Sequence, residues 1–505
     1  MLFRVYIKKT VILIGSIFLI LIIDPNLAVA QTGNIWPPPR NIPIYHPETE
    51  PPFLIADQDR TVHAFSSQWI GEDNQQKAIV YNQWNPDTGW TVQVDIILPP
   101  LKQQARILGA YMDHAGMMHV AFFSGDETEA NVYYSQAPAV QAGHAQVWTA
   151  PVMIGEQALV PENGTITGDG QGNLVIVYSG NRSQHGLYAV YSEDGGNTWT
   201  EPVPVFLTGD NQLWPYYLQM YMGEKGQLYA VWSVNDISNH GEAIYFSIFD
   251  FTSQQWSEPL TIAETRGFLG TQAPALVEYN NALFVMYYDG STGKQYQRRS
   301  SDSGETWTQA VAPFPHVGLN GPVSFVVDSN DDLHIFWGQR ITGGLGEADA
   351  HGMWHSVWND QSKTWAPYEA LVSGQKVLDL VGFTSFDPVT PHVVASQGNV
   401  ILVVWMTDYG SKGNGVWYSY KSLNAPELPV VPIPTPAADS NPTPESTKIT
   451  SQPNPTSTPK PVFTDEGGYI TEEKPLSTIL AAVIPVSVLI VGIIVLTRVF
   501  SYTRR

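Results

Sequence analysis

Residues 192–199 read Ser-Glu-Asp-Gly-Gly-Asn-Thr-Trp and residues 300–307 read Ser-Ser-Asp-Ser-Gly-Glu-Thr-Trp, two copies of one S-x-D-x-G-x-T-W phrase. Shorter versions of the phrase are centred on five other tryptophans, Trp36, Trp90, Trp148, Trp256 and Trp365. Neighbouring tryptophans of this set are 51 to 58 residues apart along the chain. A near-constant period of this size is typical of a solenoid, a propeller or a similar array.

Each repeat contains short β-branched and aromatic runs ahead of its tryptophan. In the third repeat these runs are 174–178 and 187–191, both bounded by Gly, Asn or Asp, which is the pattern of β-strands. With one strand before them and one after the tryptophan, a repeat has four strands, and four-stranded units arranged about an axis form a β-propeller. No part of 31–423 shows a sustained 3.6-residue apolar period, so we expect an all-β fold.

The two ends of the repeat region predict the number of blades. The last repeat has strands near 393–395, 400–405 and 416–420 but no tryptophan phrase, whereas the phrase at Trp36 has no strands before it. Because an open ring would expose strand edges, we expect residues 34–45 to supply the outer strand of the last blade. This closure by an N-terminal strand gives a seven-bladed β-propeller, with six blades as the alternative.

The repeated phrase resembles the Asp-box of the sialidase-type (BNR-repeat) β-propellers, over roughly residues 31–423. The resemblance implies that each box forms the turn between the third and fourth strands of a blade, on the face opposite the family's active site. In each turn the Asp accepts hydrogen bonds from turn amides, the Gly permits a positive φ, and the Trp seals one blade against the next. The residues expected to build the two complete turns are Ser192, Asp194, Gly196, Trp199, Ser300, Asp302, Gly304 and Trp307.

The resemblance also implies where a site would lie. Sialidases bind the substrate carboxylate with three arginines in a pocket on the propeller axis, since planar guanidinium groups hold carboxylates bidentately, and they use a Tyr–Glu pair and an Asp for the chemistry. The loops on the face opposite the Asp-boxes supply the catalytic candidates Arg182, Arg266, Arg340, Asp210, Asp236 and Asp349. Candidates for stacking against a sugar or hydrogen bonding to it are Trp214, Tyr216, His185, His240 and His351.

Two features depart from the family. Sialidase domains have six blades, and the family's first arginine lies in an F/Y-R-I-P phrase whose nearest counterpart here, residues 40–43, is interrupted by Asn41. No metal site and no cofactor is expected. The His351 and His355 pair would be about 13 Å apart on a strand, and residues 328–332 have the composition of a turn between two strands.

The ends of the chain predict export and anchoring. Residues 1–30 have a basic start, an apolar run and an Ala-x-Ala site, as in a secretory signal peptide, with an uncleaved anchor as the alternative. Residues 424–476 are rich in Pro, Thr and Ser and predict an extended stalk, whereas 477–499 are long and apolar enough for a transmembrane helix. The arginines that follow predict a cytoplasmic tail at 500–505, so the propeller would be extracellular at a cell membrane.

The chain is strongly acidic. Its formal charge is −22, and without the six basic residues and Asp24 that flank the two apolar segments it has 19 basic and 46 acidic residues, or −27. Such a charge repels nucleic acid and disfavours an anionic ligand. The chain has no cysteine, so it has neither disulfides nor thiol chemistry, and for an exported protein of this size that composition favours a prokaryotic source.

Three functions stay open at this point. The first, which the sequence favours, is a non-catalytic module that binds a carbohydrate or protein ligand at its axial face. The second is a cell-surface exo-glycosidase with an axial Arg/Asp site, and the third is a structural scaffold for membrane partners. Two arginines and an acid converging within about 5 Å in an axial pocket would favour the glycosidase. An aromatic-lined shallow face would favour the binding module, and a flat face would favour the scaffold.

Overall fold

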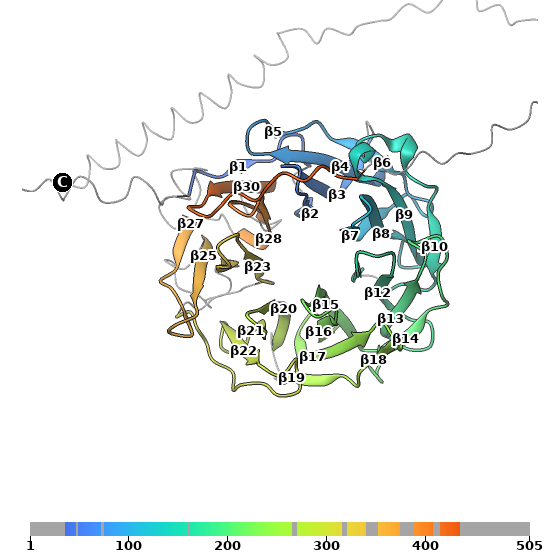
Figure 1. Cartoon of the computed structure of the whole chain (residues 1–505). Coiled ribbons are helices and arrows are strands. Elements are labelled where there is room, and N and C mark those ends of the chain that lie inside the picture. The colour runs from blue at the N-terminus through green and yellow to red at the C-terminus, as the bar shows by residue number, and fades with distance from the viewer. Residues whose placement is uncertain are drawn as a thin grey trace, which may run out of the picture. The chain divides into compact units, whose positions relative to one another are not determined.

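The computed structural model describes residues 36–46, 49–71, 75–159, 162–264, 270–315, 321–339, 352–373, 388–407 and 415–434. In these residues the chain forms seven sheets and two short 3-10 helices, η1 (Ala139–Gln141) and η2 (Ala145–Val147). The sheets stand side by side in a ring about a central axis (Figure 1). The fold is a seven-bladed β-propeller, as predicted, and the six-bladed alternative is wrong.

The blades are numbered here in chain order, and their strands are given from the axis outward. Blade 1 has β2 (Phe53–Ala56), β3 (Val62–Ile70), β4 (Gln76–Asn85), β5 (Gly89–Trp90) and β6 (Val94–Ile97), and blade 2 has β7 (Ala105–Met112), β8 (Met117–Gly125), β9 (Ala130–Pro138) and β10 (Val152–Gly155). Blade 3 has β11 (Gly164–Gly168), β12 (Leu174–Gly180), β13 (Gly186–Ser192) and β14 (Val203–Leu207). Blade 4 has β15 (Leu213–Met222), β16 (Leu228–Asp236), β17 (Gly241–Asp250), β18 (Gln255–Trp256) and β19 (Leu260–Glu264).

The remaining three blades complete the ring. Blade 5 has β20 (Thr271–Tyr279), β21 (Ala282–Asp289) and β22 (Lys294–Ser300), with an isolated bridge from Gln297 to Val311 at the outer position. Blade 6 has β23 (Ser324–Val327), β24 (Leu333–Gln339), β25 (Gly352–Asn359), β26 (Thr364–Trp365) and β27 (Glu369–Ser373). Blade 7 has β28 (Pro388–Ser396), β29 (Val400–Thr407), β30 (Gly415–Ser422) and β1 (Arg40–Asn41).

Blade 7 is built from both ends of the repeat region. Strand β1 pairs antiparallel with β30, with Arg40 opposite Tyr418. Just before β1, Trp36 is 4% exposed and donates a hydrogen bond from Nε1 to Glu369 Oε1 (2.9 Å) in blade 6. The predicted closure of the ring by the N-terminal residues is therefore confirmed.

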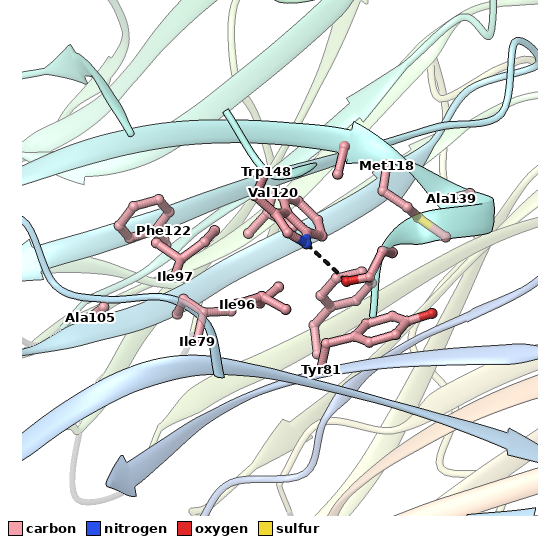
Figure 2. Packing of buried hydrophobic residues seen from close by; sticks show 13 residues of the cluster. Ile79, Tyr81, Ile96, Ile97, Ala105, Met118, Val120, Phe122, Ala139 and Trp148 are labelled. Carbon is pink, nitrogen blue, oxygen red and sulfur yellow. Dashed lines mark hydrogen bonds between the residues drawn. The ribbon is translucent and has the colours of Figure 1, made fainter. Parts of the chain in front are cut away.

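The repeated tryptophans lie at the seams between blades. The ring of Trp199 in blade 3 is 4.9 Å from that of Tyr134 in blade 2, and the Trp307 ring in blade 5 is 5.2 Å from Phe246 in blade 4. Figure 2 shows the seam of blades 1 and 2, where Trp148 packs among buried aliphatic and aromatic side chains and donates a hydrogen bond to the Ala142 carbonyl (2.9 Å). Removing a buried Trp of this kind costs about 3–5 kcal/mol, so these residues hold the ring together.

The strand directions define two faces. Each inner strand begins on one face and ends on the other, and the turns after the first and third strands of a blade lie together on the second face. In blade 3, for example, the amide of Gly195 after the third strand donates to the carbonyl of Gly172 after the first (2.9 Å). We call this side the Asp-box face and the opposite side the cavity face.

Residues 424–434 continue along the Asp-box face. The amide of Leu428 donates to the Gln397 carbonyl (2.9 Å) in blade 7, and the amide of Val431 donates to the Gln58 carbonyl (2.8 Å) in blade 1. The predicted signal peptide and transmembrane helix lie outside the described residues. Within the part of the chain that the structure describes, no helix is long and apolar enough to span a membrane.

Candidate functional site

The first complete Asp-box connects β13 to β14. Asp194 accepts hydrogen bonds from the Thr198 amide (2.8 Å) and hydroxyl (2.7 Å), and Ser192 Oγ accepts one from the Gly196 amide (2.8 Å). Gly196 has φ +87°, and a Cβ there would lie 2.0 Å from the Tyr134 hydroxyl oxygen. Only glycine fits this position, because a side chain would meet both backbone strain and a clash.

The second complete box has the same geometry after β22. Asp302 accepts from the Thr306 amide (2.9 Å), Ser300 Oγ accepts from the Gly304 amide (2.8 Å), and Trp307 Nε1 donates to the Gly304 carbonyl (3.1 Å). Hydrogen bonds from Thr306 and Ser300 lower the pKa of the Asp302 carboxyl to about 2. The side chains of both boxes are committed to the turns, so the boxes are structural.

A cavity of about 520 Å³ lies on the propeller axis. Its described lining comes from the starts of β2, β7, β11 and β23, from the middle of β15 and β28, and from the segments that lead into β2 and β11. Since inner strands begin on the cavity face, this is the face opposite the Asp-boxes, as the resemblance implied. The volume falls within the range of about 300–1,000 Å³ typical of small-molecule sites.

The backbone is strained where it lines this cavity. Tyr217 in β15 and Thr390 in β28 both have φ +52°, and each lies in a register shift of its strand pairing. A positive φ is a genuine outlier for a β-branched residue such as Thr390. Residues held in such conformations cluster at functional sites, where the surrounding structure over-determines them.

Several polar groups in the cavity are not used in hydrogen bonds that hold the fold together. The hydroxyls of Thr165, Ser324 and Thr390 line it and make no hydrogen bond to another described residue. His392 Nδ1 lies 2.8 Å from the Pro52 carbonyl and donates to it, which leaves Nε2 as the acceptor available to a ligand. Burial lowers the pKa of His392, so its ring is neutral near pH 7.

A group of four charged side chains lies beside the cavity, at the start of blades 1, 2 and 3. Glu50 and Glu162 line the cavity, whereas Arg106 in β7 donates from Nη1 to Glu162 Oε1, and Lys77 in β4 is 8% exposed. Glu162 Oε2 is buried and accepts no hydrogen bond from a described residue. Glu50 is exposed to solvent at the cavity, but the protein packed around it reduces its solvation and raises its pKa; the charge of Glu162 adds to this effect against the opposing charges of Lys77 and Arg106.

Of the catalytic candidates from the sequence, the three that the structure describes lie on the cavity face but not in the described cavity lining. Arg182 pairs with Glu201 (3.2 Å) at the surface, and Asp210 accepts from the Gln212 amide in its own turn (2.9 Å). Asp236 accepts from the His240 amide (2.9 Å) in the loop after β16. The other three, Arg266, Arg340 and Asp349, lie outside the described residues.

The four described residues among the predicted ligand-binding residues, His185, Trp214, Tyr216 and His240, also lie outside the described lining. The rings of His185 and Trp214 are 4.7 Å apart at the seam of blades 3 and 4, and His240 Nδ1 lies 3.0 Å from Asp236 Oδ2. Burial raises the pKa of Tyr216 to about 12. His351 lies outside the described residues, and no described cluster of three His, Asp or Glu residues could hold a metal ion.

Sequence reasoning missed Glu50, Glu162, Tyr217, Thr390 and His392. Their common signal was position, because each lies in or just before the inner strand of its blade. The predicted candidates were loop residues of the expected chemical types. A bulge in an inner strand has no recognisable pattern of residue types in the sequence.

The resemblance to the sialidase-type propellers is confirmed for the fold. The repeat builds the blades, and the two Asp-boxes form the turns between third and fourth strands. Arg40, in the interrupted F/Y-R-I-P counterpart, lies in the outer closing strand β1, away from the axial cavity.

Comparisons with known proteins find solved structures that are similar at low identity. The structure is similar to the NanB sialidase from Streptococcus pneumoniae (11% identity, 79% of this chain and 72% of that chain, TM-score 0.44) and to the intramolecular trans-sialidase from Ruminococcus gnavus (12%, 80% and 97%, 0.42). It is also similar to a protein of unknown function from Dyadobacter fermentans (15%, 77% and 100%, 0.45). No protein-family model and no curated protein sequence matches the chain.

Proposed function

We propose that the chain is a ligand-binding propeller whose axial cavity takes a neutral, polyhydroxylated ligand of the size of a glycan terminus. The observation that carries the proposal is the charge of the cavity lining. Among its described residues there are two carboxyl groups, Glu50 and Glu162, and neither Lys nor Arg. A carboxylate ligand entering such a site would lose its hydration and meet two carboxyl groups, whereas the nearest described cations, Lys77 and Arg106, lie outside the lining and Arg106 is bound to Glu162.

The neutral groups of the lining suit a sugar. Thr165, Ser324 and Thr390 offer hydroxyls, His392 offers an acceptor nitrogen, and Tyr217 has an aromatic ring beside them. Small-molecule sites combine apolar and aromatic walls with a few polar groups that fix orientation. The strained backbone at Thr390 and the unused hydroxyls supply such groups on opposite sides of the axis, in blades 7 and 3.

A second candidate is hydrolysis of a neutral glycoside, and the observation that favours it is the pair Glu50 and Glu162 in one cavity. Glycosidases use one protonated and one ionised carboxyl flanking the bond that is cut. Glu162 is a poor partner for this role, because Arg106 binds Oε1 and Oε2 is buried. Release of nitrophenol from neutral nitrophenyl glycosides, lost in Glu50→Gln, would establish hydrolysis, whereas binding without release supports the binding module.

The proposal is tested by NMR titration of the purified full chain with lactose, maltose, cellobiose and chitobiose, and with 3′-sialyllactose as the anionic counterpart of lactose. We expect at least one neutral disaccharide to bind, and the added sialic acid to weaken or abolish binding. Ser324→Tyr places a large side chain into the cavity and should abolish binding. Gln171→Tyr, at an exposed turn on the Asp-box face, is the matched control and should leave it unchanged. Tighter binding of 3′-sialyllactose, or binding that survives in Ser324→Tyr, would refute the proposal.

We further propose that the propeller acts at a membrane, with residues 1–30 as a signal peptide and 477–499 as the anchoring helix. The support is the sequence pattern alone, since both segments lie outside the described residues. Fractionation of cells that express the full chain and a chain truncated at residue 476 tests this. The full chain should sediment with membranes and the truncated chain should not.

A further inference from the structure

Glu50 differs from the other carboxyl groups around the cavity, because it lines the cavity without a partner. It makes no hydrogen bond or ion pair with a described residue, and it is an exposed residue of the cavity lining. The backbone on both sides is fixed. Thr49, 2% exposed, donates from Oγ1 to Gln68 Oε1 (2.9 Å), and the Pro52 carbonyl accepts from His392 (2.8 Å). The neighbouring residues therefore fix the backbone of Glu50 at the cavity, and a ligand can contact its carboxyl group.

The charges around Glu50 come from three other segments. Glu162 precedes β11, Lys77 lies in β4, and Arg106 lies in β7 and binds Glu162. Burial opposes ionisation of Glu50 and Glu162 opposes it further, while Lys77 and Arg106 favour it, and the net effect raises the pKa of Glu50. The Glu50 carboxyl is therefore protonated more readily in the free protein than an ordinary glutamate is.

Desolvation by a neutral ligand shifts the Glu50 carboxyl towards its uncharged form. Filling the cavity displaces the water that solvates a carboxylate, and it brings no positive charge in exchange, so it favours the uncharged acid. The uncharged acid is also a hydrogen-bond donor, which an ionised carboxylate is not, and sugar hydroxyl and ring oxygens accept such a bond.

We propose that Glu50 contacts the ligand as a protonated carboxyl, so that a neutral saccharide enters the axial cavity together with one proton. This inference rests on the proposed function and makes binding at that site favoured by acid. The opposite behaviour marks another ligand class, because an ammonium-bearing ligand would ionise Glu50 and release a proton.

The test uses the full chain and whichever of lactose, maltose, cellobiose or chitobiose binds. Affinity is measured by NMR titration from pH 4 to 8, and proton exchange by calorimetry in PIPES and in imidazole, which differ in ionisation enthalpy. Above the pKa of Glu50 we expect the dissociation constant to rise by up to about tenfold per pH unit and the uptake to approach one proton.

Two variants locate the effect. Glu50→Gln mimics the uncharged acid and should bind at neutral pH with no proton uptake and little pH dependence. Glu201→Gln removes an exposed carboxylate that lies outside the described cavity lining and is paired with Arg182, and it should behave as the unmodified chain does. Proton release, pH-independent binding by the unmodified chain, or unchanged pH dependence in Glu50→Gln would overturn the inference while leaving the binding function intact. Absence of binding by all four saccharides at every pH would overturn the proposed function itself.

Discussion

The two ends of the inner strands contrast sharply in how their polar groups are used. At the Asp-box end, side chains are paired in repeated sets. In blade 1, His63 lies 2.6 Å from the Tyr81 hydroxyl and 3.1 Å from Asp57. In blade 2, His119 lies 2.6 Å from the Tyr134 hydroxyl. At the cavity end the hydroxyl of Thr390 and the carboxyl of Glu50 have no described hydrogen-bond partner.

The difference separates what builds the ring from what the ring presents. Paired groups recur from blade to blade, because every blade must close its turns and seal its seam in the same way. The cavity residues do not recur, since each blade contributes a different group to one shared space. Four expectations test this contrast, from the largest effect to the smallest.

Gly196→Ala should cause the largest loss of stability. The new Cβ would lie 2.0 Å from the Tyr134 hydroxyl oxygen at φ +87°, and overpacking together with positive-φ strain costs about 3–5 kcal/mol. Chemical denaturation measures the loss. The control is Gly195→Ala at φ +69°, where the Cβ meets nothing within 4 Å, and it should cost only about 1–2 kcal/mol. Equal losses would show that the fit against blade 2 is unimportant.

Acid should lower the stability of the fold through the two buried histidines of blade 6. His334 Nδ1 lies 2.9 Å from His355 Nε2, and His355 Nδ1 lies 2.9 Å from Glu369. Burial and the neighbouring His355 lower the pKa of His334 to about 4. The unfolded chain therefore takes up the proton first as the pH falls, so the stabilisation is complete above about pH 6.5 and is lost towards pH 4.

The expected loss is about 2 kcal/mol between pH 6.5 and pH 4, measured by denaturation at each pH. His334→Gln should be less stable at neutral pH and should lose less on acidification. A chain whose stability is constant over this range, or a variant with the unmodified pH profile, would contradict the account of blade 6.

Thr390→Gly should separate stability from binding. Glycine removes the strain of a β-branched residue at φ +52°, which outweighs its entropic cost, so stability should rise by about 0.5–1 kcal/mol. Loss of the hydroxyl should weaken saccharide binding about fivefold. Asn281→Gly, at φ +58° in a turn of the Asp-box face, is the control and should leave affinity unchanged. Full affinity in Thr390→Gly would remove this residue from the site.

The smallest effect is expected for Arg182→Ala. Its ion pair with Glu201 is exposed, and surface pairs of this kind contribute about 0–1 kcal/mol. Neither denaturation nor saccharide titration should detect a change beyond about 0.5 kcal/mol. A large loss of binding would show that Arg182 contacts the ligand, as an arginine clamp requires.

Sequence reasoning predicted the ring well because the features that build it repeat. The spacing of the tryptophans predicted the blades, and the phrase at Trp36, which has no strands before it, predicted how the ring closes. The phrase around Asp194 predicted the geometry of the turn. The recurring Asp and His six residues apart, at 57 and 63 and again at 113 and 119, carried the same kind of information but was overlooked.

The cavity could not be predicted in this way. Its residues are far apart in the sequence and are brought together only by ring closure, as Glu50 and His392 are through the Pro52 carbonyl. The positive φ of Tyr217 and Thr390 depends on register shifts between strands, and no local pattern of residue types specifies such a shift.

The most direct test of the central claim is the titration of the unmodified chain, Ser324→Tyr and Gln171→Tyr with the four neutral disaccharides. The account predicts that a disaccharide bound by the unmodified chain binds Gln171→Tyr equally and is rejected by Ser324→Tyr. Equal binding by all three proteins would place the ligand elsewhere and would contradict the assignment of the axial cavity as the site.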